Sequence, residues 1–324
     1  MVEKSHPDAP PPLQPKPEDM DFDLDRALKS VVTLQANIPE DAFTAQILGT
    51  ERAGNGVVIG ENGLVLTIGY LITEAESVWL TDSTGKVVPA HALAYDQESG
   101  FGLVQALGKL ELPALKLGAV KDARLGDPVI VVGGGPKLTV GARIIGKQEF
   151  AGHWEYLLDE AVFTAPAHPF WGGAGMIGQD GQLLGIGSLH VQHVTERGRQ
   201  QDINMIVPID LLPPILDDLL AYGRVNKPAR PWLGVYSGES GGRIIVANVA
   251  ARGPAATAGL REGDIISAVR DSSIEGLADF YRKIWGCGPA GVEIPIEVVR
   301  DRRSFWLRIK SVDRNSFLRK PRLQ

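Results

Sequence analysis

Short apolar segments alternate with glycine-containing turns over most of the first 208 residues. Examples are the segments 56–60, 64–69, 100–106 and 128–132. Runs this short and this rich in Val, Ile and Leu favour β-strands. Many short strands at regular spacing, separated by glycine turns, predict an all-β domain closed into barrels. The 324 residues are enough for about two domains, so a second unit is expected after this one.

Residues 164–188 combine a glycine-rich loop with a predicted hairpin. A short strand at residues 176–177 and a second strand at 183–186 flank a turn at Gln179, Asp180 and Gly181. Asp-Gly between two apolar runs is a strong hairpin signal, because both residues tolerate a positive φ. The sequence therefore predicts a loop followed by two paired strands.

This segment resembles the nucleophile segment of HtrA/DegP-type serine proteases, in which N-P-G-N-S-G-G-P-L-V precedes a short turn and a V-I-G-I strand. His168 and Pro169 stand at the family's N-P, and Gly185 and Ile186 stand at its G-I. The nucleophilic serine then falls on Gly172, which has no side chain. The resemblance covers roughly residues 22–208 and implies the two six-stranded barrels of the trypsin-like fold.

The same resemblance places the other two members of the catalytic triad. The family's G-Y-I-L-T-N-x-H-V-V matches part of residues 54–72, with Tyr70 at the histidine. The family's T-D-P-x-T-D-L-A-V-L matches residues 94–105, where Asp96 keeps the first aspartate and Gly100 replaces the triad aspartate. A serine hydrolase needs a hydroxyl, a base and an orienting carboxylate. The resemblance therefore implies that no intact triad is present.

The loop that forms the oxyanion hole in the family corresponds to Phe170, Trp171 and Gly172. An oxyanion hole consists of N–H groups aimed at the developing negative charge. Phe170 replaces the glycine that precedes the family's serine by two residues. Two bulky aromatic side chains would occupy room that a substrate carbonyl needs, so we expect this loop to follow a different course.

The C-terminal part resembles a PDZ domain. Residues 254–269 match P-A-x-x-A-G-L-x-x-G-D-x-I, and residues 230–235 match the segment whose backbone receives a peptide C-terminus. Such domains bind an extended peptide by strand addition. The implied peptide-binding residues are Trp232, Leu233, Gly234 and Val235. A helix at 279–285 and strands near 293–300 and 304–310 would complete the domain.

A helix is predicted between the two domains, at residues 208–223. Leu211, Leu212, Ile215, Leu216, Leu219 and Leu220 recur with a helical period. Asp210 is expected to cap this helix, and Gly223 to end it. The predicted organisation is a disordered tail at 1–20, a degenerate protease-fold domain at 21–208, a linker helix and linker at 209–229, a PDZ domain at 230–312 and a tail at 313–324.

Composition and the N-terminal sequence bear on possible binding partners and on the cellular location. The net charge of −6 gives no reason to expect nucleic-acid binding, and no segment has the ~18–20 consecutive apolar residues of a membrane span. The single cysteine, Cys287, allows no intramolecular disulfide and is expected to fill a turn. No cofactor or metal is expected. Without an apolar leader in residues 1–20, the expected location is the cytoplasm, or the periplasm if a leader was removed.

Several polar residues admit a structural and a functional interpretation. Asp96 is expected to fix a turn, and Tyr70 to fill the vacated cleft. His168 could act as a base beside the altered site, although position 172 offers no nucleophile. His190 and His193 lie three residues apart, near a predicted strand end. They would point to opposite faces, which disfavours a shared metal.

Taken together, these features predict an inactive HtrA-like protein that binds peptides or protein C-termini through its PDZ domain. One alternative is an active endopeptidase that uses unconventional groups near His168 and Tyr70. Another is a structural assembly module. The resemblance also implies a homo-oligomer, in particular a trimer.

Overall fold

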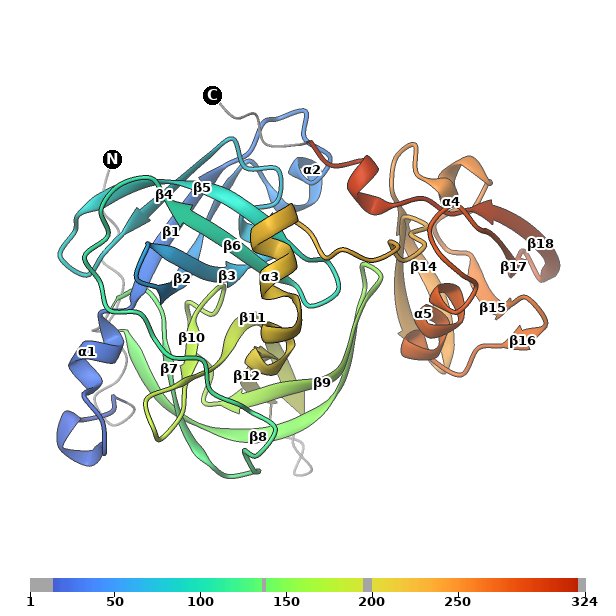
Figure 1. Ribbon diagram of the computed structural model, residues 1–324. Coiled ribbons are helices and arrows are strands. Elements are labelled where there is room, and N and C mark those ends of the chain that lie inside the picture. Colours follow the sequence, from blue (N-terminus) through green and yellow to red (C-terminus); the bar gives the residue numbers. More distant parts are fainter. Residues whose placement is uncertain (1–13, 136–137, 195–199, 320–324) are drawn as a thin grey trace. The chain divides into compact units, whose positions relative to one another are not determined.

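The computed structural model describes residues 14–135, 138–194 and 200–319. Its contacts divide the chain into two compact units, which are described separately. Unit 1 comprises Met1–Gln148, Glu160–Val225 and Arg319–Gln324, and unit 2 comprises Glu149–Asp159 and Asn226–Leu318. The elements appear in Figure 1 in chain order from blue to red.

The first half of unit 1 is a closed six-stranded barrel with the strand order β1-β2-β3-β6-β5-β4. Its strands are β1 (Val31–Asn37), β2 (Glu51–Gly60), β3 (Leu64–Ile68), β4 (Ser77–Thr81), β5 (Val87–Tyr95) and β6 (Phe101–Ala106). Neighbouring strands pair antiparallel, and β1 and β5 alternate buried and more exposed residues. This alternation is typical of strands with one face toward a core. Buried Leu34, Leu66 and Leu103 belong to that core.

The second half of unit 1 is another closed barrel, with the strand order β10-β11-β12-β9-β8-β7. Its strands are β7 (Pro128–Val132), β8 (Thr139–Gly152), β9 (Tyr156–Ala165), β10 (Gly175–Ile177), β11 (Leu183–Val194) and β12 (Gln200–Pro208). The predicted hairpin at 176–186 is therefore confirmed as β10 and β11. The prediction of two six-stranded trypsin-like barrels is confirmed as well.

Short helical segments connect and flank these barrels. They are η2 (Pro17–Asp19), α1 (Leu24–Leu28), α2 (Ala45–Leu48), η3 (Gly69–Leu71), η4 (Ile209–Leu211) and α3 (Pro213–Tyr222). Asp23 caps α1 by accepting a hydrogen bond from the Arg26 N–H. Residues 1–13 of the predicted disordered tail lie outside the described residues, whereas residues 17–19 form η2.

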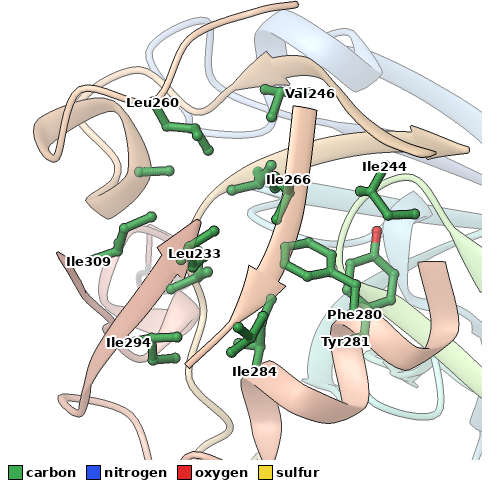
Figure 2. Close-up of a cluster of buried hydrophobic side chains, with 14 of the residues drawn as sticks. Leu233, Ile244, Val246, Leu260, Ile266, Phe280, Tyr281, Ile284, Ile294 and Ile309 are labelled. Carbon is green, nitrogen blue, oxygen red and sulfur yellow. The ribbon is translucent and has the colours of Figure 1, made fainter. Parts of the chain in front are cut away.

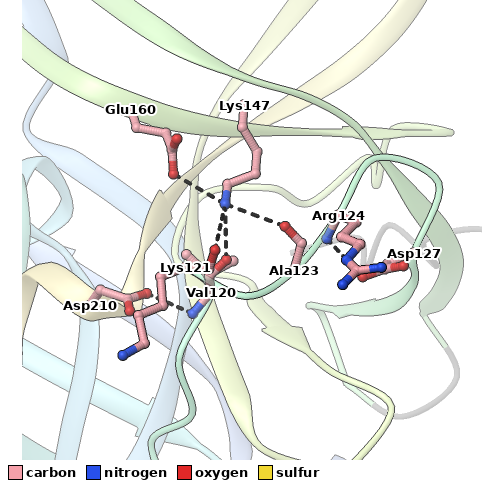
Figure 3. A network of polar contacts seen from close by, with 8 residues as sticks. All are labelled: Val120, Lys121, Ala123, Arg124, Asp127, Lys147, Glu160 and Asp210. Carbon is pink, nitrogen blue, oxygen red and sulfur yellow. Dashed lines mark hydrogen bonds and ion pairs between the residues drawn. The ribbon is translucent and has the colours of Figure 1, made fainter.

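The predicted linker helix is present as η4 and α3, but two details of the prediction are wrong. Asp210 does not cap α3; its Oδ2 accepts a hydrogen bond from the Val120 N–H at 2.7 Å instead (Figure 3). The apolar face is also narrower than predicted. Leu212 and Leu219 are fully buried, whereas Leu211 and Leu220 are 37% and 43% exposed. Gly223 ends the helix in the left-handed conformation, as predicted.

Lys147 on β8 fastens the loop that contains Val120. Its Nζ donates to the carbonyl oxygens of Val120 and Ala123, at 3.1 and 3.3 Å, and pairs with Glu160 on β9 at 3.2 Å (Figure 3). The Val120 N–H in turn reaches Asp210. These contacts join strands of the second barrel to the start of the linker helix.

Unit 2 contains a sheet with the strand order β13-β14-β15-β17-β18, and β16 pairs with β15. Its elements are β13 (Val235–Ser240), β14 (Arg243–Val249), α4 (Pro254–Thr257), β15 (Ile265–Val269), β16 (Ser272–Ser273), α5 (Leu277–Trp285), β17 (Glu293–Arg300), β18 (Arg303–Lys310) and η5 (Arg314–Ser316). The side chains of Leu233, Ile266, Phe280 and Ile294 meet in its core (Figure 2).

The tip of the β8–β9 hairpin, residues 149–159, belongs to unit 2. Leu157 is buried in the same core cluster as Leu233 and Phe280. The sequence-based division assigned these eleven residues to the 21–208 domain. The contacts instead make unit 2 a body assembled from two segments that are far apart in the chain.

Candidate functional site

The structure brings together the residues at the presumed triad positions. A Cβ added to Gly172 would lie 2.9 Å from the Tyr70 hydroxyl oxygen. The N–H of Gly69, the residue before Tyr70, donates to the Gly100 carbonyl at 2.7 Å. These three positions offer one phenol and no serine, imidazole or carboxylate.

The Tyr70 hydroxyl is hydrogen-bonded within the protein. It donates a hydrogen bond to the Ser188 carbonyl at 2.9 Å. Burial raises the pKa of the Tyr70 phenol above its ordinary value of 10.0, because the charged phenolate would lose hydration. A neutral, half-buried phenol that donates to a carbonyl is a poor base, and these contacts are compatible with Tyr70 filling this space.

Asn55 on β2 holds the loop that would carry a nucleophile. Its Nδ2 donates to the carbonyl oxygens of Phe170 and Gly172 at 2.9 and 3.0 Å. Its Oδ1 accepts from the Gly134 N–H at 2.6 Å. Asn55 is 2% exposed, so these bonds form away from water. The loop is thus fastened between the two barrels by one amide side chain.

The contacts of His168 are those of a structural residue and not of a general base. It is fully buried, and its Nε2 donates to the Leu138 carbonyl while its Nδ1 accepts the Phe170 N–H at 3.0 Å. A carbonyl only accepts and an N–H only donates, so this imidazole is neutral with its proton on Nε2. Burial lowers its pKa below 6.5. Both ring nitrogens are therefore used within the loop.

The hydrogen bond from the Phe170 N–H to His168 makes this N–H unavailable as an oxyanion donor. Phe170 stands at the position of the family's glycine, and its N–H donates to Nδ1 of the His168 ring. The next N–H after Gly172, that of Gly173, donates to the Gly187 carbonyl at 2.8 Å. Trp171 lies with its ring 5.1 Å from that of His190. The expected change in the course of this loop stays a prediction.

The other polar candidates have local roles. Asp96 fixes a turn, because its Oδ2 accepts from both the N–H and the hydroxyl of Ser99 at 2.7 Å. Cys287 lies just after α5, and its thiol donates to the Lys283 carbonyl at 3.2 Å. His190 and His193 are exposed on β11. No group of three or more potential metal ligands occurs among the residues that the structure describes.

A second arrangement of donors lies in unit 2, at the predicted peptide-binding segment. Gly234 has a φ of 76°, and a Cβ there would lie 3.0 Å from both Ala250 and Trp232. This left-handed residue allows three successive N–H groups to converge. They converge on the carboxylate of Glu155. Its Oε1 accepts from Gly234 at 2.7 Å, from Val235 at 2.9 Å and from Leu233 at 3.2 Å.

Two family models match the chain. A trypsin-like peptidase domain matches residues 54–186, and a PDZ domain matches residues 231–310. Two relatives with detectable sequence similarity are named as serine endoproteases. A probable periplasmic serine endoprotease DegP-like from Pseudomonas fluorescens is 28% identical over 265 residues, which is 78% of this chain and 54% of the relative. The serine endoprotease DegS of Escherichia coli is 25% identical over 281 residues, 79% of this chain and 75% of the relative. The chain is therefore similar to HtrA-type serine proteases in both of its matched domains.

Solved structures agree with the HtrA-type fold. The HtrA-type protease AlgW with a decapeptide has a TM-score of 0.53 and 22% identity, and the match covers 92% of this chain and 98% of that one. A serine endoprotease from Yersinia pestis has a TM-score of 0.52 and 22% identity, over 90% and 96% of the two chains. The chain spans about half the length of the DegP-like relatives that it matches.

The relatives do not support the predicted cytoplasmic location, because the DegP-like relatives are named as periplasmic. Among the described residues, no helix has the length and apolar character needed to cross a membrane.

Sequence reasoning found Tyr70, Gly100 and Gly172 and the loop at 232–235, but it missed Glu155. The family pattern contains no signal for Glu155, because this residue lies between the matched motifs. One local signal existed: a glutamate directly before the apolar strand Tyr156–Ala165, at a hairpin turn where glycine or asparagine is usual.

Proposed function

We propose that this HtrA-type chain is proteolytically inactive and serves as a binding protein. The observation that carries the proposal is Gly172 facing the Tyr70 hydroxyl, where a serine would need a base. The relatives are named as serine endoproteases, so inactivity separates this chain from them. Loss of a complete triad lowers kcat by about 10⁶-fold in a well-studied serine protease.

The contacts of His168 also argue against an unconventional protease. A general base must have a free nitrogen near the proton that it removes. Both His168 nitrogens are engaged, and the Phe170 N–H that would stabilise an oxyanion is engaged with one of them. These contacts therefore support neither His168 as a base nor the Phe170 N–H as an oxyanion donor.

The test measures labelling of the full chain by a fluorophosphonate and cleavage of casein by the full chain. We expect both the labelling and the cleavage to stay at background level. The matched variant is Gly172→Ser with Tyr70→His and Gly100→Asp, which supplies all three side-chain types. It should also remain unlabelled, because the Phe170 N–H still points to His168 and Gly100 has a left-handed φ of 84°. Inhibitor-sensitive proteolysis by the wild-type protein would overturn the proposal.

We further propose that unit 2 binds protein C-termini. Support comes from Leu233, Gly234 and Val235, whose N–H groups already hold one carboxylate. Trp232 flanks this loop and is expected to shape it. Hydrogen bonds to a charged group contribute roughly 1.5–3 kcal/mol each. Peptides with a free C-terminus should therefore bind at least about tenfold more tightly than their amides, since about 1.4 kcal/mol corresponds to a factor of ten.

This second proposal is tested by fluorescence polarisation on the full chain, with labelled heptapeptides ending in valine, leucine or phenylalanine. Each peptide is made as the acid and as the amide. Equal affinity of the two forms would show that the groove reads internal segments. The expected homotrimer and the location of the protein stay predictions, to be checked by light scattering and by cell fractionation.

A further inference from the structure

The carboxylate-binding loop of unit 2 holds a carboxylate from its own chain. Glu155 is 5% exposed, and all three N–H groups of the loop point to its Oε1, while Oε2 also accepts from Leu233 at 3.1 Å. Successive N–H groups that converge in this way form an anion site. The occupant is therefore bound as the end of a peptide would be, through a side chain instead of a terminus.

The residues before Glu155 lie along the edge of β13. The Ser237 N–H donates to the His153 carbonyl at 2.9 Å, and His153 Nδ1 lies 2.9 Å from the Ser237 carbonyl. In the sheet order, β13 is an end strand, so the edge that faces His153 pairs with no other strand of the sheet and can accept an added segment. Main-chain bonds from an extended segment to such an edge are the mode by which PDZ domains take up peptides.

Helix α5 holds the other side of the segment. The Tyr281 hydroxyl donates to the Gly152 carbonyl at 2.7 Å and accepts from the Glu155 N–H at 3.3 Å. Arg282 pairs with Glu149 and Asp159 at 2.5 Å each, one on either side of the hairpin tip. Residues 152–155 thus make hydrogen bonds to both β13 and α5.

The hairpin also contributes an apolar side chain. Leu157 is 8% exposed and belongs to the core cluster that includes Leu233, Val235 and Phe280. A peptide ligand of such a domain provides a carboxylate, main-chain bonds and an apolar side chain. The 149–159 hairpin tip provides all three kinds of contact.

The backbone of Glu155 gives an independent indication. Its φ is 55°, in the left-handed region. Glycine or asparagine adopts this region at little cost, whereas other L-residues lose roughly 1–2 kcal/mol. A buried glutamate at such a turn position is explained by what its carboxylate contacts and not by the turn itself.

We propose that residues 151–155 are an intrachain ligand of the unit 2 groove, with Glu155 in the place of a C-terminal carboxylate, so that an outside C-terminus binds only when it displaces these five residues. The displacement of residues 151–155 by an outside C-terminus rests on the proposed binding of C-termini. The occupation of the groove by Glu155 does not. Groove occupation and peptide binding are therefore measured in separate experiments.

The first measurement is hydrogen–deuterium exchange on the full chain. In Glu155→Ala, the N–H groups of residues 233–237 should exchange at least about tenfold faster than in the wild-type protein. Amides of β17 and β18 should be unchanged, which excludes general unfolding of unit 2. The matched control is Glu160→Gln, an exposed glutamate of β9 that pairs with Lys147 and makes no bond to the loop. Unchanged exchange at 233–237 in Glu155→Ala would overturn the proposal.

The second measurement is peptide affinity, with the acid and amide heptapeptides described above. The acids should bind Glu155→Ala at least about tenfold more tightly than they bind the wild-type protein and Glu160→Gln. Faster exchange without peptide binding in any variant would support the intrachain ligand and refute the binding of C-termini. Equal, tight binding of the acids to all variants would support C-terminal recognition and refute displacement of the hairpin tip.

Discussion

Two adjacent glycines in the altered catalytic loop have opposite steric surroundings. A Cβ at Gly173 would lie 1.9 Å from the Asn55 carbonyl oxygen and 2.7 Å from Thr67 Oγ1, and Gly173 has a φ of 76°. A Cβ at Gly172 would meet only the Tyr70 ring, at its hydroxyl end. Gly173 is therefore required by the fold, whereas the glycine at position 172 is not.

This difference predicts unequal effects of two alanine substitutions. Gly173→Ala should lower the free energy of unfolding by about 3 kcal/mol or more, because overpacking costs about 1–3 kcal/mol and the left-handed backbone adds to it. Gly172→Ala should lower it by only about 1 kcal/mol, because the added methyl group meets only the end of the Tyr70 side chain and no backbone. Urea unfolding of both variants checks this. Similar losses in the two variants would contradict it.

At the scale of single elements, the hairpin tip at 149–159 should respond to pH. Burial raises the pKa of the Glu155 carboxyl from 4.5 to about 7, and the bonds from Val235, Leu233 and Gly234 only partly oppose this. Between these two values, the docked tip retains a proton that a solvent-exposed tip has lost. Docking therefore weakens as the pH rises from 4.5 to about 7, by up to about 1.4 kcal/mol for each pH unit.

Peptide affinity is the readout for this pH effect. Free-acid heptapeptides should bind the wild-type chain more tightly at pH 7.5 than at pH 5.5, and Glu155→Gln should remove most of this dependence. Charged or ionisable neighbours of Glu155 are Arg314, Tyr236 and Tyr281, and His153 lies on the same turn. All of them remain in Glu155→Gln. An equal pH dependence in this variant would assign the effect to one of these neighbours.

The elements show where sequence reasoning succeeds. The β10–β11 hairpin could be predicted because Asp180-Gly181 is a local turn signal between apolar runs. Helix α3 could be located by its period, but not the partner of Asp210, because Val120 lies 90 residues away in the chain. The contact between Glu155 and Gly234 could not be predicted either, because the two residues are about 80 positions apart in the chain. Neither the protease-like motifs nor the PDZ motif includes Glu155. Local geometry is encoded locally, whereas tertiary partners of polar side chains are not.

At the scale of the whole molecule, unit 2 depends on residues far away in the chain. Leu157, from the β8–β9 hairpin, belongs to the core of a body otherwise made of residues 226–318. A Leu→Ala change in a core typically costs about 2–5 kcal/mol. Leu157→Ala should therefore accelerate hydrogen exchange over 226–318 and leave the barrels protected.

The matched control is Val129→Ala, in the core of the second barrel, where the residue is 4% exposed. It should accelerate exchange in strands β7–β12 and spare residues 226–318. Both variants are compared in the full chain under identical conditions. A Leu157→Ala variant that affects only the barrels would mean that the hairpin tip adds nothing to the stability of unit 2.

A groove that is occupied by the protein's own hairpin lowers the apparent affinity of the groove for outside ligands. If the tip with Glu155 is docked in about 99% of the molecules, every outside ligand appears about a hundredfold weaker than its contacts alone would make it. A terminus with an intrinsic dissociation constant near 1 µM would then need roughly 100 µM to half-fill the groove. Scarce single termini would go unnoticed, whereas termini presented together at high local concentration would be captured. The hairpin tip would thus set a detection threshold, and substitutions in its turn would move that threshold without altering which ligands the groove prefers.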